Sequence, residues 1–257
     1  MELISEDKLR VLASQKKKDL IMLEKDYFLT LFLYLTKDRE GLYFKGGTAL
    51  NKIFLNHIRL SEDLDYTITI PLSDVKEIID QIIRENGNIF TTLKYDKNVD
   101  NFTRYLLHYK SYFKKDSSII LDFNKRAKLA SNPEKNTIKN FYGYQFKVHT
   151  LSKEEIIAEK VCALLNRNKP RDYYDVYQII TKNIPINMDL VEKKCYLHGQ
   201  QCNILKIFDK SKKIYQNWEK DLSQLTAKMV PFTTVMKVLK EYFKYAEEKE
   251  KAKKSIL

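Results

Sequence analysis

The sequence predicts an α+β protein with helices at its N-terminus, a sheet in the middle and a helical lobe at its C-terminus. Apolar residues recur every three or four positions between Ser5 and Thr36, which indicates helix. Residues 63–70 instead alternate apolar and polar side chains, which indicates a half-buried strand. Helical spacing returns beyond Leu151 and continues along the rest of the chain. The predicted domains are therefore residues 1–150 and residues 151–257.

Residues 5–36 predict two helices, because neither Pro nor Gly interrupts them and the triplet Lys16-Lys17-Lys18 favours a solvated break. A short predicted strand over residues 41–45 ends in Gly46-Gly47-Thr48, and residues 49–56 have helical spacing again. This part of the chain therefore predicts a strand, a tight turn and a helix in succession.

The predicted strand at residues 63–70 is followed by a helix that begins at Pro71 and ends before Gly87. Two further runs, residues 103–112 and 118–124, predict a pair of strands joined by a polar turn. The remaining elements expected before Leu151 are a polar loop over residues 130–140 and a strand around Phe146 and Val148.

Composition excludes several classes of protein. The chain has 257 residues, of which 44% are hydrophobic and 31% charged, so it can build a core and is not a disordered chain. No apolar run approaches the ~20 residues that cross a bilayer, and the acidic N-terminus lacks the apolar segment of a signal peptide. Three scattered cysteines do not make a disulfide scaffold. We therefore expect a soluble, cytoplasmic protein.

Three aspartates are candidate metal ligands. Asp63 and Asp65 lie two residues apart on one predicted strand, so both carboxylates face the same side of the sheet. Carboxylate oxygens are the ligands that Mg²⁺ prefers. Asp122 lies in an apolar run, where burial of an unpaired carboxylate would be costly, so we expect it to bind a cation or to face a cleft. A solvated strand edge is the alternative for the first two.

A second candidate feature is the glycine turn before the first aspartates. Gly46, Gly47 and Thr48 occupy a predicted strand-to-helix junction, where glycines let backbone N–H groups approach phosphate. Arg59 and Ser61 lie just before Asp63 and could contact the same phosphates. The alternative is a tight turn that needs a positive φ and binds nothing.

The helical lobe carries the third candidate feature. Lys160 lies beside the apolar stripe of its helix, and Arg167 lies two turns further on along the same side. Such a pair of cations would suit a triphosphate, unless Lys160 merely reaches past its apolar neighbours to water. In the next helix, which Pro170 begins, Asp172 either complements the helix dipole or orients Lys160 or Arg167.

Five short motifs follow one another between about residues 20 and 180. They are Glu24-Lys25-Asp26-Tyr27, Lys45-Gly46-Gly47-Thr48-Ala49-Leu50, Arg59-Leu60-Ser61-Glu62-Asp63-Leu64-Asp65, Ala158-Glu159-Lys160 and Arg171-Asp172-x-x-Asp175. In this order they resemble the AbiEii/AbiGii-type toxin nucleotidyltransferases of type IV toxin–antitoxin and abortive-infection (phage defence) systems. The resemblance implies a nucleotidyltransferase core of the DNA polymerase β type, with a mixed sheet, and a helical C-terminal lobe that closes a cleft for an NTP.

The resemblance also implies roles for individual residues. Those implied for catalysis are Asp63, Asp65, Asp122, Lys160 and Asp172, and the first three of them are the implied ligands of Mg²⁺ or Mn²⁺. For nucleotide binding the resemblance implies Gly46, Gly47, Thr48 and Lys160, and the positions of Arg59, Ser61 and Arg167 described above add these three residues to the candidates. The reaction would transfer a nucleoside monophosphate from an NTP to an acceptor hydroxyl and release pyrophosphate, whose charge Lys160 and Arg167 would offset.

The expected acceptor is the 3′ end of tRNA, and the expected protein partner is a cognate antitoxin. A net charge of +12 favours a polyanion, because basic groups gain affinity by displacing counterions, although a lysine-rich solvated surface is the alternative. A basic cluster surrounds the predicted strand pair: Lys110, Lys114, Lys115, Lys125, Arg126 and Lys128. The aromatic residues among them could stack on unpaired bases: Tyr109, Tyr112 and Phe113.

Two other functions remain open at this level. A nucleotidyltransferase that modifies a protein or a small molecule would show little salt-dependent affinity for RNA. A module that binds an NTP or RNA without catalysis, or that acts only through its complex with a partner, would tolerate Asp63→Ala. The sequence names neither the donor nucleotide nor the oligomeric state.

Overall fold

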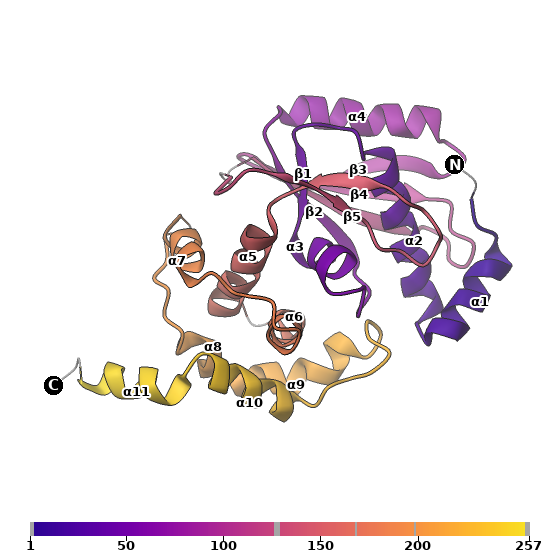
Figure 1. The fold of residues 1–257 in the computed structure, drawn as a ribbon. Coiled ribbons are helices and arrows are strands. Elements are labelled where there is room, and N and C mark those ends of the chain that lie inside the picture. The colour runs from indigo at the N-terminus through magenta and orange to yellow at the C-terminus, as the bar shows by residue number, and fades with distance from the viewer. Residues whose placement is uncertain (1–2, 126–128, 168, 198, 255–257) are drawn as a thin grey trace. The chain divides into compact units, whose positions relative to one another are not determined.

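The computed structural model describes residues 3–125, 129–167, 169–197 and 199–254. The chain divides into two compact units, Met1–Lys153 and Glu154–Leu257. The first contains the sheet and the second is helical, so the predicted α+β class is confirmed (Figure 1). None of the described helices is long and apolar enough to cross a membrane.

The sheet of the first unit is mixed and has the strand order β3-β4-β5-β2-β1-β7-β6. Near its centre, β2 runs parallel to β5 and antiparallel to β1, which in turn runs parallel to β7. The bounds are β1 Leu42–Lys45, β2 Asp63–Ile68, β3 Phe90–Val99, β4 Phe102–Tyr109, β5 Ser118–Asn124, β6 Glu134–Thr137 and β7 Lys147–Thr150.

The helices of the first unit are α1 (Glu6–Lys16), α2 (Leu20–Leu35), α3 (Gly46–Ala49), which continues into a π-helical turn (Leu50–Phe54), and α4 (Leu72–Glu85). The predicted break between α1 and α2 is present, since Lys17 has a left-handed backbone (φ 50°). Helix α2 is almost wholly buried, and its Phe28 ring stacks on Tyr109 of β4 with ring centroids 3.9 Å apart. Apolar side chains of α2 and of β4 thus form one core.

Three elements differ from the sequence predictions. Strand β3 was not predicted, and β6 lies inside the segment that we expected to be a polar loop, residues 130–140. Both are edge strands with mostly exposed or half-buried side chains, so backbone hydrogen bonds to β4 and β7 form them without any apolar pattern. The helix expected at residues 49–56 begins earlier, at Gly46, and ends as a π-helical turn.

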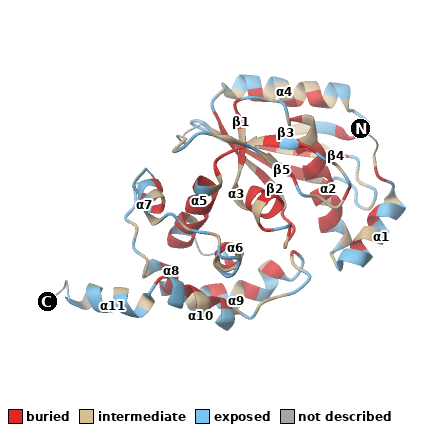
Figure 2. Ribbon diagram, viewed as in Figure 1, coloured by how far each residue is buried: buried red, intermediate tan, exposed pale blue. Residues whose placement is uncertain are grey.

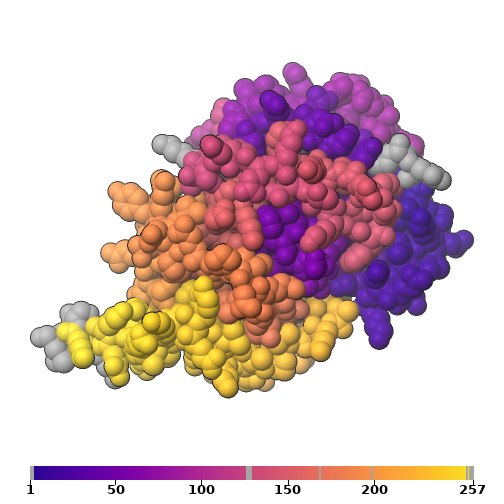
Figure 3. Space-filling view, in the orientation of Figure 1, coloured from indigo at the N-terminus to yellow at the C-terminus, as the bar shows by residue number. Residues whose placement is uncertain are grey.

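A buried charge network holds the segment that leads into β2. The Asp26 carboxylate accepts hydrogen bonds from Lys52 Nζ (2.8 Å) and the Tyr142 hydroxyl (2.9 Å), and it lies 3.0 Å from His57 Nε2. Burial acts to raise the pKa of Asp26, but His57 and Lys52 outweigh it and hold this pKa below its ordinary value. In Figure 3 the purple surface of the π-helical turn borders the pink segment around residue 140, where Lys139 N–H donates to the Lys52 carbonyl.

The second unit consists of helices whose buried sides form its core (Figure 2). Helix α6 packs against α9 and α10, and the Tyr173 hydroxyl donates to the carbonyl oxygen of Ile207 at 2.7 Å. All three cysteines of the chain are free thiols: Cys162, Cys195 and Cys202. The bounds are α5 Lys153–Asn166, α6 Pro170–Thr181, α7 Met188–Leu197, α8 Lys206–Asp209, α9 Ser211–Leu222, α10 Phe232–Tyr242 and α11 Tyr245–Lys254.

Candidate active site

Strand β2 places Asp63 and Asp65 on the polar face of the sheet. Both residues are half-buried, whereas Leu64 and Tyr66 between and beyond them are buried on the opposite face, as their alternation predicts. In the register of the sheet Asp65 lies opposite Asp122 of the parallel strand β5. The strands therefore bring the three predicted carboxylates onto one face of the first unit.

Gly46 makes room for the Asp65 carboxylate. It has a positive φ of 76°, and a Cβ atom at this position would lie 2.2 Å from Asp65 Oδ2 and 2.9 Å from Asp65 Cγ. Only glycine satisfies both the backbone conformation and the close approach. The turn is thus a tight turn with a positive φ, and it also sets the position of one of the predicted metal ligands.

Thr48, Ser61 and Arg59 are buried beneath this turn. The Thr48 hydroxyl donates to the Asp63 carbonyl oxygen and lies 2.6 Å both from that oxygen and from Ser61 Oγ. Arg59 is 2% exposed and donates through Nη1 to the carbonyl oxygen of Leu60 at 2.9 Å. In this structure Thr48 links α3 to Ser61 and to the start of β2, whereas Arg59 contacts its own neighbour Leu60. The predicted contact of the three residues with phosphate stays a prediction.

Asp122 is bound by a residue that the sequence did not single out. Arg104 of β4 lies opposite Asp122 and donates from Nε to Oδ1 and from Nη2 to Oδ2, both at 2.7 Å. These hydrogen bonds raise the pKa of Arg104 above its ordinary value, so the guanidinium stays charged. Among the described residues no three carboxylate, imidazole or thiol side chains converge as a metal cluster would.

Lys160 is the centre of a buried ion cluster in the second unit. Its Nζ lies 3.0 Å from Asp172 Oδ1 and 3.1 Å from Asp175 Oδ2, and all three side chains are at most 4% exposed. The lysine does not extend to water, so that alternative is wrong. Arg167, whose side chain is 60% exposed, donates to Asp172 from Nε (2.7 Å) and Nη2 (3.0 Å).

Asp172 holds both cations at once. Burial acts to raise the pKa of Asp172, but the charges and hydrogen bonds of Lys160 and Arg167 outweigh it and lower this pKa to about 2. The carboxylate is therefore ionised at any physiological pH. Its position in the first turn of α6 also suits the helix dipole, so the two alternatives considered for it coexist.

Most of the chain matches the model of a known protein family. Residues 28–247 match the family model described as "Nucleotidyl transferase AbiEii toxin, Type IV TA system". The chain belongs to the AbiEii family. It is therefore a nucleotidyltransferase toxin of a type IV toxin–antitoxin system, and a cognate antitoxin is its partner in such a system. No curated protein matches its sequence.

Solved structures share the fold of this AbiEii protein. MenT4, a nucleotidyltransferase toxin from Mycobacterium tuberculosis H37Rv, superposes with a TM-score of 0.66 at 18% sequence identity, over 96% of this chain and 93% of MenT4. JHP933 from Helicobacter pylori superposes with a TM-score of 0.58 at 21% identity, over 93% of this chain and 99% of JHP933.

The predicted RNA-binding cluster is only partly available on the surface of the AbiEii chain. Its described lysines are exposed: Lys110, Lys114, Lys115 and Lys125. Tyr109 is 5% exposed beneath Phe28 and cannot stack on a base, which corrects the prediction. The Arg10 guanidinium lies 4.7 Å from the centre of the Phe113 ring, while Tyr112 is 38% exposed. Arg126 and Lys128 lie outside the described residues.

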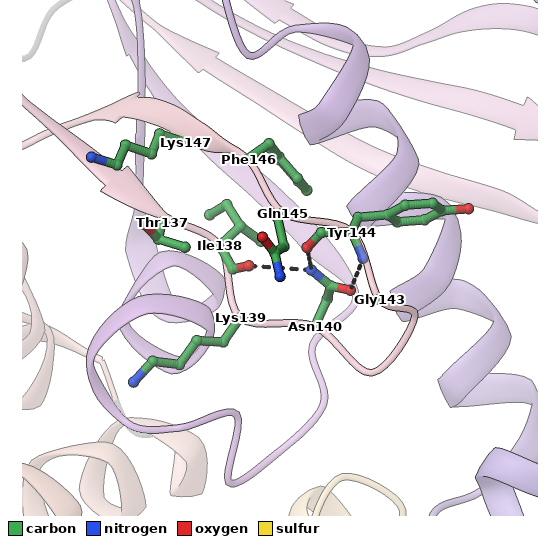
Figure 4. A pocket seen from close by; sticks show the side chains of 9 residues that line it. All are labelled: Thr137, Ile138, Lys139, Asn140, Gly143, Tyr144, Gln145, Phe146 and Lys147. Atoms are coloured by element: carbon green, nitrogen blue, oxygen red, sulfur yellow. Dashed lines mark hydrogen bonds between the residues drawn. The ribbon is translucent and has the colours of Figure 1, made fainter. Parts of the chain in front are cut away.

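A cavity of about 640 Å³ lies at the turn between β6 and β7, at the edge of the sheet that is opposite β3. Asn140 holds this turn, since its Nδ2 donates to the carbonyl oxygens of Ile138 (3.2 Å) and Tyr144 (2.7 Å), as Figure 4 shows. None of the predicted site residues lines the cavity. It therefore does not enter the candidate site.

The first motif of the AbiEii resemblance turns out to be an anchor. Glu24 accepts hydrogen bonds from Ser111 Oγ and from the Tyr112 N–H, both at 2.6 Å, and Asp26 centres the network described above. The Tyr27 hydroxyl accepts from the Ile4 N–H at 3.0 Å. Burial of all three side chains indicates a structural role for this motif.

Proposed function

We propose that this AbiEii protein transfers a nucleoside monophosphate from an NTP to a hydroxyl at the 3′ end of tRNA, with release of pyrophosphate. The observation that carries the proposal is the pair Asp63 and Asp65 on one face of β2, with the Gly46 turn against Asp65. A pair of carboxylates beside a strand-to-helix turn suits binding of a cation together with a polyphosphate.

The chemistry of the donor set fits Mg²⁺ or Mn²⁺. Asp63 and Asp65 are half-buried oxygen ligands on the same strand face, and we propose that they hold the cation. Bound Mg²⁺ would lower the pKa of the acceptor hydroxyl and offset charge on the triphosphate. Asp122 is already bound by Arg104, so its expected role as a third ligand depends on that pair.

Backbone groups of the glycine turn would receive the phosphates. Helix α3 begins at Gly46, beside Asp65, and the first N–H groups of a helix have no acceptor within it. Gly47 keeps the next position free of a side chain. Buried Thr48 and Ser61 would act by fixing this turn against the start of β2, as their hydrogen bonds indicate. Arg59 would fix the segment just before β2 through its bond to the Leu60 carbonyl.

In the second unit we propose Arg167 as the cation that meets a phosphate group, because its side chain is 60% exposed while it is bound to Asp172. Lys160 and Asp172 would then serve the reaction by orienting this guanidinium and by supplying fixed charge. Lys160 is buried and doubly paired, which supports a role in holding the cluster together.

The acceptor is proposed from charge. The chain carries +12, and its exposed lysines beside the turn between β4 and β5 would contact the phosphates of a nucleic acid. Contacts of this kind are lost steeply as salt rises. A protein or small-molecule acceptor would not show that dependence.

The test incubates purified protein with total tRNA, Mg²⁺ and each α-³²P-labelled NTP in turn. Wild type is compared with Asp63→Asn/Asp65→Asn and with Asp38→Asn, a matched control at an aspartate that is 80% exposed beside Lys37. We expect label on tRNA from wild type and from the control, and a loss of roughly 10³-fold or more in the double variant.

Two results would count against the proposal. Absence of label on tRNA with every NTP would overturn the acceptor, and label on a protein or small molecule would then replace it. Label that persists in the folded double variant would overturn the role of the two aspartates. Circular dichroism of each variant establishes that it is folded.

A further inference from the structure

Four side chains form a charged row across the polar face of the sheet. In register order from β4 to β1 they are Arg104, Asp122, Asp65 and Lys45. Residues opposite one another on neighbouring strands lie on the same face of a sheet. The two carboxylates at the middle of the row are thus flanked by one basic residue on each side, and Asp63 lies two residues before Asp65 on β2.

Arg104 binds Asp122 through both oxygen atoms of its carboxylate. Each Asp122 oxygen accepts one N–H of the guanidinium at 2.7 Å, in the bidentate arrangement that makes arginine–carboxylate pairs strong and oriented. The Asp122 side chain is 10% exposed and that of Arg104 is 36% exposed. A cation that took Asp122 as a ligand would have to displace this guanidinium in a place where little water could replace it.

Asp63 and Asp65 have different surroundings. The Oδ1 atom of Asp63 lies 3.4 Å from the Thr48 hydroxyl, which is at the limit of a hydrogen bond. The Asp65 carboxylate packs against the backbone of Gly46. In addition, no three acidic, imidazole or thiol groups of the described chain converge on one point. The bidentate pair with Arg104 thus distinguishes Asp122 from the other two aspartates, although all three lie on one face of the sheet.

We propose that Arg104 is a positioning residue that keeps Asp122 out of the metal-binding set, so that Asp63 and Asp65 alone bind the divalent cation. Asp122 then serves to hold the Arg104 guanidinium beside the site as a fixed positive charge. This inference rests on the proposed function and deepens it, because it limits the protein ligands of the cation to two carboxylates.

A cycle of two substitutions tests this with Mn²⁺ alone. Four proteins are titrated calorimetrically with Mn²⁺ in the absence of nucleotide: wild type, Arg104→Gln, Asp122→Asn, and Arg104→Gln/Asp122→Asn. The double variant replaces a charged pair by a neutral pair of similar size that can still hydrogen-bond. Thermal unfolding of each variant shows that it is folded.

We expect the double variant to bind Mn²⁺ within about threefold of wild type, because it keeps both ligands and the net charge of the row. Arg104→Gln alone should bind about tenfold more tightly, since it releases a third carboxylate beside the site. Asp122→Asn alone should bind several-fold more weakly, because the charge of Arg104 is no longer compensated.

The opposite pattern would overturn the inference. If Asp122 is a ligand, the double variant and Asp122→Asn lose Mn²⁺ affinity by similar factors, tenfold or more, whatever residue stands at position 104. A fifth protein, Asp63→Asn, separates this failure from that of the proposed function. Unchanged Mn²⁺ affinity in Asp63→Asn, or no binding by wild type, would overturn both.

Discussion

The two units of this AbiEii protein each carry a cluster of aspartates with basic partners, and the clusters differ in how far they are closed to water. On β2, Asp63 and Asp65 are half-buried. In the second unit the side chains of Lys160, Asp172 and Asp175 are 4%, 2% and 0% exposed. The first cluster can exchange a ligand with solvent, whereas the second is closed around its own lysine.

The same residue types thus have different surroundings in the two units: in the second they fasten two helices, and in the first we propose that they bind a cation. A buried lysine without partners would be strongly destabilising, so two carboxylates of α6 compensate Lys160 of α5 and fasten the two helices. The sheet face carries three aspartates, Asp63, Asp65 and Asp122, beside two basic residues, Lys45 and Arg104. The resulting excess of negative charge would attract a cation.

The largest expected effect is on the closed cluster. Lys160→Met would remove the buried cation that contacts both Asp172 and Asp175, so we expect the free energy of unfolding to fall by about 3–5 kcal/mol. Urea denaturation of the full chain measures it. Arg167→Met is the matched control and should cost about 1 kcal/mol or less, because its side chain is 60% exposed. Equal losses in the two variants would show that the burial of Lys160 does not set its contribution to stability.

A smaller effect is expected at the open cluster. Gly46→Ala adds a Cβ to a residue with a φ of 76° and drives it against the Asp65 carboxylate, so we expect a loss of about 2–3 kcal/mol together with most of the transferase activity. Gly143→Ala has the same backbone problem, at a φ of 85°, with no atom within 4 Å of the added Cβ. It should cost about 1 kcal/mol and leave activity intact.

Activity separates the two glycine variants. If both lose activity equally, strain of the backbone alone explains the effect, and the close approach of Gly46 to Asp65 does not matter. If neither does, the turn tolerates a shifted carboxylate.

The smallest expected effect is the acid response of the closed cluster. The pKa of Asp172 is lowered from 3.8 to about 2, so its contribution to stability is complete above about pH 4 and is lost as the pH falls through about 2. This contribution is about 2 kcal/mol. The difference in unfolding free energy between wild type and Asp172→Asn should therefore shrink between pH 4 and pH 2 in urea titrations. A constant difference over that range would contradict the ion pairing of Asp172.

Patterns that depend on a single element were predictable from the sequence. The alternation in residues 63–68 predicts which side chains of β2 share a face. The helical spacing in α5 and α6 predicts that Asp172 orients Lys160 or Arg167, and the structure shows Asp172 in contact with both. Their functional roles stay predictions. The strands β3 and β6 were missed because an exposed edge strand needs no apolar pattern.

The pairing of Arg104 with Asp122 was not predictable from either residue alone, because it depends on the register between β4 and β5. The predicted strands, residues 103–112 and 118–124, are joined through residues 114–117, and a hairpin symmetric about the middle of that turn would place Asp122 opposite about residue 109 instead. The observed register is symmetric about residue 113, which the sequence pattern does not indicate. Without that register, Asp122 had only its own neighbours in the sequence to suggest a role.

The alternation of β2 has a consequence for how the sheet assembles. A slip of one residue against β5 would turn Asp63 and Asp65 toward the core beneath α2 and leave Leu64 and Tyr66 in water. Burying two unpaired carboxylates costs several kcal/mol, so misregistered pairings are rejected as the sheet forms. The residues proposed to bind the cation thus also favour the correct register of β2 against β5 during folding, before any nucleotide is present.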